Sequence, residues 1–139
     1  MTKIYRIQHK ETKDGVYKYR GESPKYSEQF GEIVCNGDSS EVHPGPLDDS
    51  LFKDNYLEKG GSALDIYFKL TKYIFGFESI EQLRFWLYND SMICFLAEWD
   101  FELVIYESEN VIVGNTQVAF EKESAKIIEK NPLLDLLNK

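Results

Sequence analysis

The chain has 139 residues, of which 42% are hydrophobic and 14% aromatic, and its formal net charge is −8. This length and composition exclude a disordered protein and predict one domain, residues 1–139, that buries a core without metal or disulfide staples. Residues 21–110 hold six Lys or Arg against eighteen Asp or Glu, a net charge of −12, whereas residues 1–20 carry +4. The acidic excess repels phosphate backbones, so we expect no general nucleic-acid binding and favour a basic protein partner.

The compartment is indicated by the cysteines and the hydropathy pattern. Cys35 and Cys94 stand far apart and belong to no zinc-type cluster, which fits reduced thiols. The start, Met1 to Lys3, shows no secretory signal, and no apolar run approaches the length of a membrane span. We therefore expect a cytoplasmic protein that does not contact a membrane.

The first predicted elements form a hairpin. The β-branched and aromatic residues of 3–9 predict a strand, Asp14-Gly15 predicts a turn, and VYKYR at 16–20 predicts the returning strand. Alternation places Arg6 on one strand face, where an ion pair is the default role, and His9 near the turn, where we expect a surface position.

Residues 21–61 form the least regular part of the chain. They contain six of the nine glycines and three of the four prolines, with the cluster HPGPLDD at 43–49. The run EIVC at 32–35 is compatible with a short strand. A connection of this length is usually functional, partly disordered, or contains an element that the pattern does not reveal.

The middle of the chain predicts helices. Apolar spacing over 62–73 predicts a helix that begins near a serine. IFGF at 74–77 is compatible with a buried strand or with a tight turn into the next helix. Ser79 followed three places later by Gln82 is the signature of a capping box and predicts a helix over 80–88. Its predicted apolar stripe comprises Ile80, Leu83 and Leu87, widened by Phe85 and Trp86. A second helix is predicted over 92–99.

The C-terminal third predicts strands and a final helix. Residues 101–107 alternate as a strand does, VIV at 111–113 begins another, and TQVAF at 116–120 follows a Gly-Asn break. Asn131-Pro132 predicts the start of a helix over 133–138. The element order predicts a mixed α+β domain with short helices and a largely antiparallel sheet that includes residues 3–9, 101–107 and 116–120.

Four motifs together resemble a family of small phage and prophage proteins. They are IYRIQHKET at 4–12, HPGPLDD at 43–49, FGFESIEQLRFWL at 75–87 and FELVIYESENVIVGNTQVAF at 101–120. The resemblance implies a phage origin and a role in the cytoplasm of an infected bacterium, and it implies no particular activity.

A second set of residues resembles the ADP-ribosyltransferase-like folds. Arg6 stands on the first strand, Ser79 precedes a helix within F-x-S, and Gln117 occupies the later-strand position where that family carries a catalytic Glu. The resemblance implies binding of NAD or a related nucleotide, with His43 folding over the site. Because an amide cannot supply the negative charge that stabilises an oxocarbenium-like transition state, it implies binding without turnover.

Each candidate residue also has a structural interpretation. The Ser79 hydroxyl serves equally as a helix N-cap, and Arg6 as a structural residue of a strand. His43 stands near Asp48 and Asp49, with His9 and Asp54 as further donors, but this spacing is not that of a metal site, and we predict none. No nucleophile or phosphate-loop motif is present, so no catalytic residue is assigned.

The hypothesis we favour from the sequence is a non-enzymatic phage accessory protein, without a cofactor, that binds and inhibits a host or defence protein. Its contact surface would lie in residues 38–58, here named the acidic segment. The candidate contact residues are Asp38, Glu41, Asp48, Asp49 and Asp54. The alternative is the NAD-binding domain implied by the second resemblance.

Overall fold

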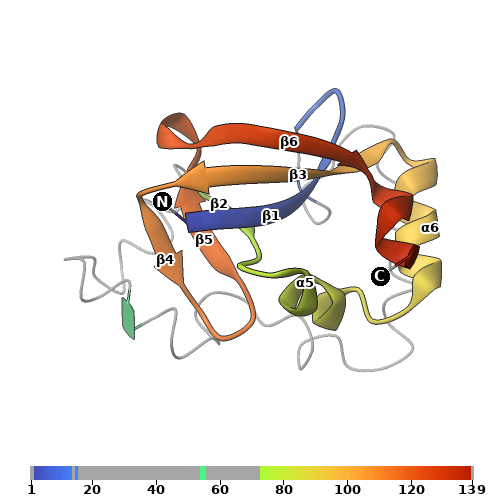
Figure 1. The fold of residues 1–139 in the computed structure, drawn as a ribbon, viewed down its shortest axis with the longest axis horizontal. Coiled ribbons are helices and arrows are strands. Elements are labelled where there is room, and N and C mark those ends of the chain that lie inside the picture. Colours follow the sequence, from blue (N-terminus) through green and yellow to red (C-terminus); the bar gives the residue numbers. More distant parts are fainter. Residues whose placement is uncertain (1, 14, 16–53, 56–72, 139) are drawn as a thin grey trace.

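The computed structural model describes residues 2–13, 15, 54–55 and 73–138 (Figure 1). Its elements are, in chain order, β1 (Thr2–His9), β2 (Tyr73–Gly76), α5 (Ile80–Trp86), α6 (Asp90–Glu98), β3 (Phe101–Ser108), β4 (Val111–Val113), β5 (Val118–Glu121), the 3-10 helix η3 (Lys122–Ser124), β6 (Lys126–Pro132) and the 3-10 helix η4 (Leu133–Asn138). The predicted α+β class is confirmed. The strands predicted at 16–20 and 32–35 lie outside the described residues. So does the helix predicted over 62–73, except for Tyr73, which begins β2 instead.

The strands form two antiparallel sheets, ordered β1-β3-β6 and β2-β5-β4. The prediction that residues 116–120 share a sheet with 3–9 and 101–107 is wrong, because this segment contributes β5 to the second sheet. β5 pairs with β4 through a short hairpin and with β2 on its other side. The β4–β5 hairpin joins residues that are close in sequence, and closing so short a loop costs less chain entropy than pairing with a distant strand.

The two sheets are joined where the chain leaves β2. The backbone N–H of Tyr5 donates to the oxygen of Phe77 at 2.7 Å, and the N–H of Phe77 donates to the oxygen of Tyr5 at 2.8 Å. Gly76 lies against Ile4 at this junction, where an added Cβ would stand 2.5 Å from Ile4 Cγ2. The absence of a side chain at Gly76 therefore lets β2 approach β1 closely.

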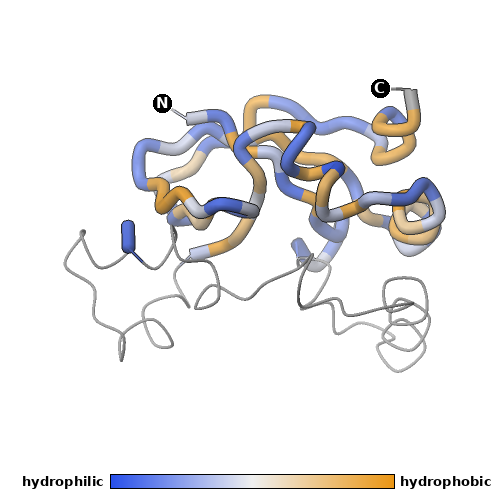
Figure 2. Tube along the Cα trace, turned by 90° about the horizontal axis from the view of Figure 1, so that it is seen from below, coloured by the Kyte–Doolittle hydropathy of each residue, from blue (hydrophilic) through white to orange (hydrophobic). Residues whose placement is uncertain are grey.

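β3 is the central strand of its sheet, and the core packs against both of its faces. On one face, Phe101 and Leu103 meet the hydrophobic residues of α6 and η4, both of which are mostly hydrophobic along the chain (Figure 2). On the other face, Val104 and Tyr106 pack with residues of β1 and β5. This placement between two apolar layers explains why nearly every residue of β3 is buried.

The helix starts follow the predicted capping chemistry. The Ser79 hydroxyl accepts from the N–H of Gln82 at 3.0 Å, and the Gln82 side-chain oxygen accepts from the N–H of Glu78 at 2.9 Å. Asn89 caps α6 in the same way through Met92, so this helix begins two residues before its predicted start. Among the predicted apolar residues of α5, Phe85 is an exception with 57% of its surface exposed.

The C-terminal region differs from the sequence prediction in two respects. β6, which pairs with β3, was not predicted, because its residues are exposed and charged and show no alternation of apolar positions. The segment 133–138 is a 3-10 helix, and Pro132 ends β6 instead of opening an α-helix. Pairing with β3, a non-local contact, decides the conformation of residues 126–132.

Candidate functional site

A buried polar cluster lies on the face of β1 and β3 that is turned toward the second sheet. It consists of Arg6, Gln8 and Tyr106, and Gln8 is only 1% exposed. The Arg6 Nε–H donates to Gln8 Oε1 at 3.2 Å, and the Tyr106 hydroxyl donates to the same oxygen at 2.8 Å. One amide oxygen therefore satisfies two buried donors, from two different strands.

The Arg6 guanidinium ties three segments together. Nη1 donates to the backbone oxygen of Phe75 at 2.6 Å, and Nη2 donates to the oxygen of Lys13 at 3.4 Å. Gly15 lies beside the guanidinium, where an added Cβ would stand 3.3 Å from Nη2. These hydrogen bonds join β1 to β2 and to the turn that follows β1, which is a structural role for Arg6.

The Gln8 side chain keeps one donor without a partner. Among the described residues, none accepts a hydrogen bond from its buried Nε2. Exchanging the amide oxygen and nitrogen would not help, because Arg6 Nε can only donate and requires the oxygen. Leaving a buried donor unpaired costs about 1–3 kcal/mol, so the two bonds to Gln8 Oε1 come at a cost to the fold.

Tyr106 is held in its neutral form. Burial raises the pKa of its hydroxyl above the ordinary value, while the positive charge of Arg6 acts in the opposite direction. Burial is the largest of these effects. At neutral pH the hydroxyl is therefore a donor, as the 2.8 Å bond to Gln8 requires.

His9 is buried, which corrects the prediction of a surface position. Its Nδ1 accepts from the N–H groups of Glu11 at 3.1 Å and Thr12 at 3.2 Å. The ring also meets Phe101 edge-on, with the centroids 5.4 Å apart. The turn after β1 folds back over the imidazole, with Lys13 in a left-handed conformation (φ 65°), and this explains the burial.

The predicted nucleotide-binding residues occupy separate structural positions. Ser79 caps α5, and Gln117 is buried in the loop between β4 and β5, where its backbone oxygen accepts from the N–H of Gly114 at 2.9 Å. Gln82 Nε2 donates to the oxygen of Asn115 at 3.2 Å, which brings the α5 cap beside this loop. Arg6 is on β1, and His43 lies outside the described residues. Nucleotide binding by these four residues stays a prediction.

Two residues of the acidic segment are described, and Asp54 is the one candidate contact residue among them. Asp54 is exposed, and the neighbouring Asn55 donates from Nδ2 to the oxygen of Val113 at 2.7 Å. This bond places the short segment 54–55 beside β4, at an edge of the second sheet (Figure 1). The other four candidate contact residues, Asp38, Glu41, Asp48 and Asp49, lie outside the described residues.

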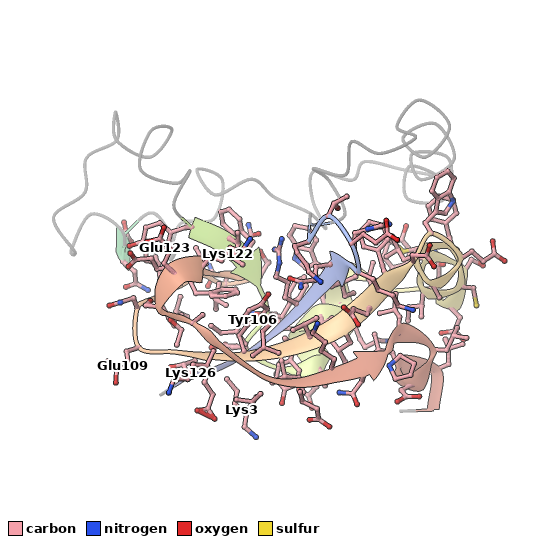
Figure 3. The ribbon with its side chains drawn as sticks, turned by 90° about the horizontal axis from the view of Figure 1, so that it is seen from above. Lys3, Tyr106, Glu109, Lys122, Glu123 and Lys126 are labelled. Carbon is pink, nitrogen blue, oxygen red and sulfur yellow. The ribbon has the colours of Figure 1, made fainter. Side chains whose placement is uncertain are left out.

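Charges alternate across the first sheet at the end where the chain begins. Glu107 of β3 stands between Lys3 of β1 and Lys126 of β6 in the strand register. The two lysines lie at the same end of the sheet (Figure 3). Opposite charges at directly paired positions favour this register modestly.

Within the part of the chain that the structure describes, no three His, Cys, Asp or Glu side chains are grouped to hold a metal ion. In the same residues, no helix is long and apolar enough to cross a membrane. Cys94 is a free, exposed thiol.

The geometry defines a small α+β protein in which two antiparallel sheets meet at a buried polar cluster. A family model described as Bacteriophage T4 Y00F protein matches residues 1–134. The chain belongs to this family, and the resemblance to small phage proteins is confirmed. Comparison with curated proteins and with solved structures gave no match. The comparisons add nothing to the ADP-ribosyltransferase resemblance.

Proposed function

We propose that this phage-family protein is an accessory protein that binds and inhibits a host or defence protein through its acidic segment. The observation that carries the proposal is the concentration of charge, a net −12 over residues 21–110 in a chain of net −8. A surface of one sign accelerates encounter with a partner of the opposite sign and excludes partners of the same sign. The partner surface is therefore basic.

The position of Asp54 supports this proposal. Its side chain is exposed, and the Asn55 hydrogen bond to Val113 fixes the adjoining backbone to β4. A charge held on a rigid element loses less conformational entropy on binding than one on an unattached loop. Asp54 is thus an anchored charge at one end of the acidic segment.

The described polar residues favour binding over catalysis for a further reason. Arg6 and Ser79, two of the four residues of the nucleotide hypothesis, make hydrogen bonds that hold the fold, and so does His9. A side chain committed to a cap or a turn in this way cannot also move freely to a substrate. Binding through surface charge places no such demand on these residues.

The test is recovery of a partner from bacterial lysate by the tagged protein at low and at moderate salt. We expect one partner with a basic surface, retained at low salt and reduced at moderate salt, because screening weakens exposed charge pairs. The test variant neutralises the five candidate residues by Asp→Asn and Glu→Gln substitution. It should lose roughly tenfold or more in affinity, as expected when several rim charges are removed.

A matched control separates the acidic segment from net charge alone. It carries five Glu→Gln substitutions at exposed positions elsewhere: Glu11, Glu81, Glu98, Glu109 and Glu123. This control should bind as the unaltered protein does. Equal loss in both variants would reject the segment as the contact surface. NAD-dependent labelling of lysate proteins, without a recovered partner, would favour the nucleotide hypothesis instead.

A further inference from the structure

We propose that β6 is a dimerisation strand, which pairs antiparallel with β6 of a second copy of this chain. The first sheet ends at β6, whose inner edge pairs with β3. Among the described residues, no strand pairs with its outer edge. That edge presents backbone N–H and C=O groups in the geometry that another strand accepts.

An exposed apolar pair lies among the charged residues of β6. Natural edge strands are often blunted by charges, by proline or by a bulge. β6 has charges at Lys126, Glu129 and Lys130 and ends at Pro132, but these charges are of both signs, and Ile127 and Ile128 are 48% and 44% exposed. β1, at the opposite edge of the sheet, differs because Phe77 and Gly15 make bridges with it. The exposed apolar pair of β6, between Lys126 and Glu129, marks this edge as the one available for pairing.

An irregularity in β6 determines which side chains share a face. Lys126 pairs with Glu107 and Ile127 with Tyr106, but Glu129 pairs with Ile105, so that Ile128 is an extra residue. On a regular strand, positions three apart point to opposite faces. Since Glu107 and Ile105 share a face of β3, the extra residue brings Lys126 and Glu129 to the same face of β6.

This arrangement makes β6 complementary to itself. In a two-fold antiparallel pair, residues opposite each other must share a face, and Lys126 of one copy can then stand opposite Glu129 of the other. The symmetry produces two such Lys–Glu pairs and places Ile127 opposite Ile128 of the second copy. A register shifted by one residue would place Lys126 opposite Lys130, which lies on the other face of β6, and it is excluded because opposite residues must share a face. The Lys126–Glu129 pairs therefore favour the stated register.

The charge pairs give a test by reversal and rescue. Sedimentation equilibrium over a concentration series should show a dimer for the unaltered chain. Lys126→Glu and Glu129→Lys each create two like-charge pairs, so each should weaken the dimer roughly tenfold or more. The double variant, and an equimolar mixture of the two single variants, should restore dimerisation, because each again pairs opposite charges.

A second variant is independent of the charges. Ile128 has no partner on β3, so Ile128→Lys alters the outer edge without removing a strand pair of the monomer. It should abolish the dimer while circular dichroism stays unchanged. The control is Leu134→Lys on η4, which removes an apolar side chain of similar exposure, 48% against 44% for Ile128, outside β6 and should dimerise normally.

Three results would overturn the proposal. The first is a monomer for the unaltered chain at its highest soluble concentration. The second is unchanged dimerisation in Ile128→Lys. The third is a mixture of the two charge variants that dimerises no better than either alone, which would place the interface elsewhere or in another register.

Discussion

A single side-chain oxygen, Oε1 of Gln8, organises the polar interior of this protein. It accepts from Arg6 on the same strand and from Tyr106 on the next, although Gln8 and Tyr106 are 98 positions apart in sequence. The sequence places Gln8 on the same strand face as Arg6, but alternation cannot reveal that a second sheet covers this face. A polar residue there would otherwise be assigned to the surface.

The first prediction concerns Tyr106→Phe. The substitution keeps the ring packing against Phe120 and removes the hydroxyl donor, so the free energy of unfolding should fall by about 0.5–1.5 kcal/mol at neutral pH. Gln8 Oε1 still accepts from Arg6, which limits the loss. Urea unfolding measures the change. The same substitution in a Gln8→Met background should cost clearly less, and equal costs would show that the bond does not contribute.

The pH dependence of the same variant follows from the pKa of Tyr106. Burial raises this pKa in the folded state above the ordinary value of about 10, so the folded state holds the hydroxyl proton to higher pH than the unfolded state does. The stability contributed by this difference is complete below about pH 10 and is lost as pH rises through the raised native pKa. The unaltered chain should therefore lose more stability than Tyr106→Phe in that alkaline range.

At the scale of elements, the sequence predicted the helices and strands that have a local pattern, and it missed β6, which depends on pairing with a strand distant in sequence. The Ser79–Gln82 spacing predicted where α5 begins, because both ends of a capping interaction lie within four residues. β3 was predicted from its alternation of apolar residues. β6 has no such signal, since it is exposed along its length and is fixed only by its register with β3.

Two candidate residues have structural roles that the sequence did not reveal. A resemblance made Arg6 a ligand candidate and its place near a turn made His9 a surface residue, whereas the structure shows a hydrogen bond from Arg6 to Phe75 and buries His9 under the turn after β1. Phe85 was predicted to widen the apolar stripe of α5, yet a seven-residue helix buries only one side, which Leu83 and Trp86 already occupy. The partner of Arg6 is 69 positions away, whereas the hydrogen-bond partners of His9 lie within three residues of it.

A further prediction concerns Ser79, the N-cap of α5. Ser79→Ala removes the acceptor of the Gln82 N–H and should lower the free energy of unfolding by about 1 kcal/mol, whereas Ser79→Asp should retain most of the stability because aspartate also caps helices. Thermal unfolding measures both variants. If Ser79 instead served a bound nucleotide, Ser79→Ala would leave the stability of the free protein unchanged and alter only the binding of NAD.

At the scale of the whole molecule, the two sheets depend on one another through a narrow contact. The paired backbones of Tyr5 and Phe77 join β1 to the end of β2, and Arg6 adds its bond to Phe75 a short distance away. The core residues of β3 and β5 can pack together only when this junction holds the sheets at the correct separation. Substitutions at the junction should therefore destabilise both sheets together and lower the temperature of the global unfolding transition.

Gly76→Ala tests that dependence directly. The added Cβ would meet Ile4 Cγ2 at 2.5 Å and the Tyr5 oxygen at 3.0 Å, so the sheets must separate or Ile4 must move, at a cost of roughly 1–3 kcal/mol. Gly15→Ala is the matched control. Its Cβ would meet the guanidinium of Arg6 at 3.3 Å, the end of a long side chain, and the cost should be smaller.

Thermal unfolding measures both variants, and the melting temperature of Gly76→Ala should be well below that of Gly15→Ala. In an Ile4→Ala background the further cost of Gly76→Ala should shrink, because the space beside Gly76 is then open. Equal melting temperatures for the two glycine variants would mean that the sheets do not meet at Gly76.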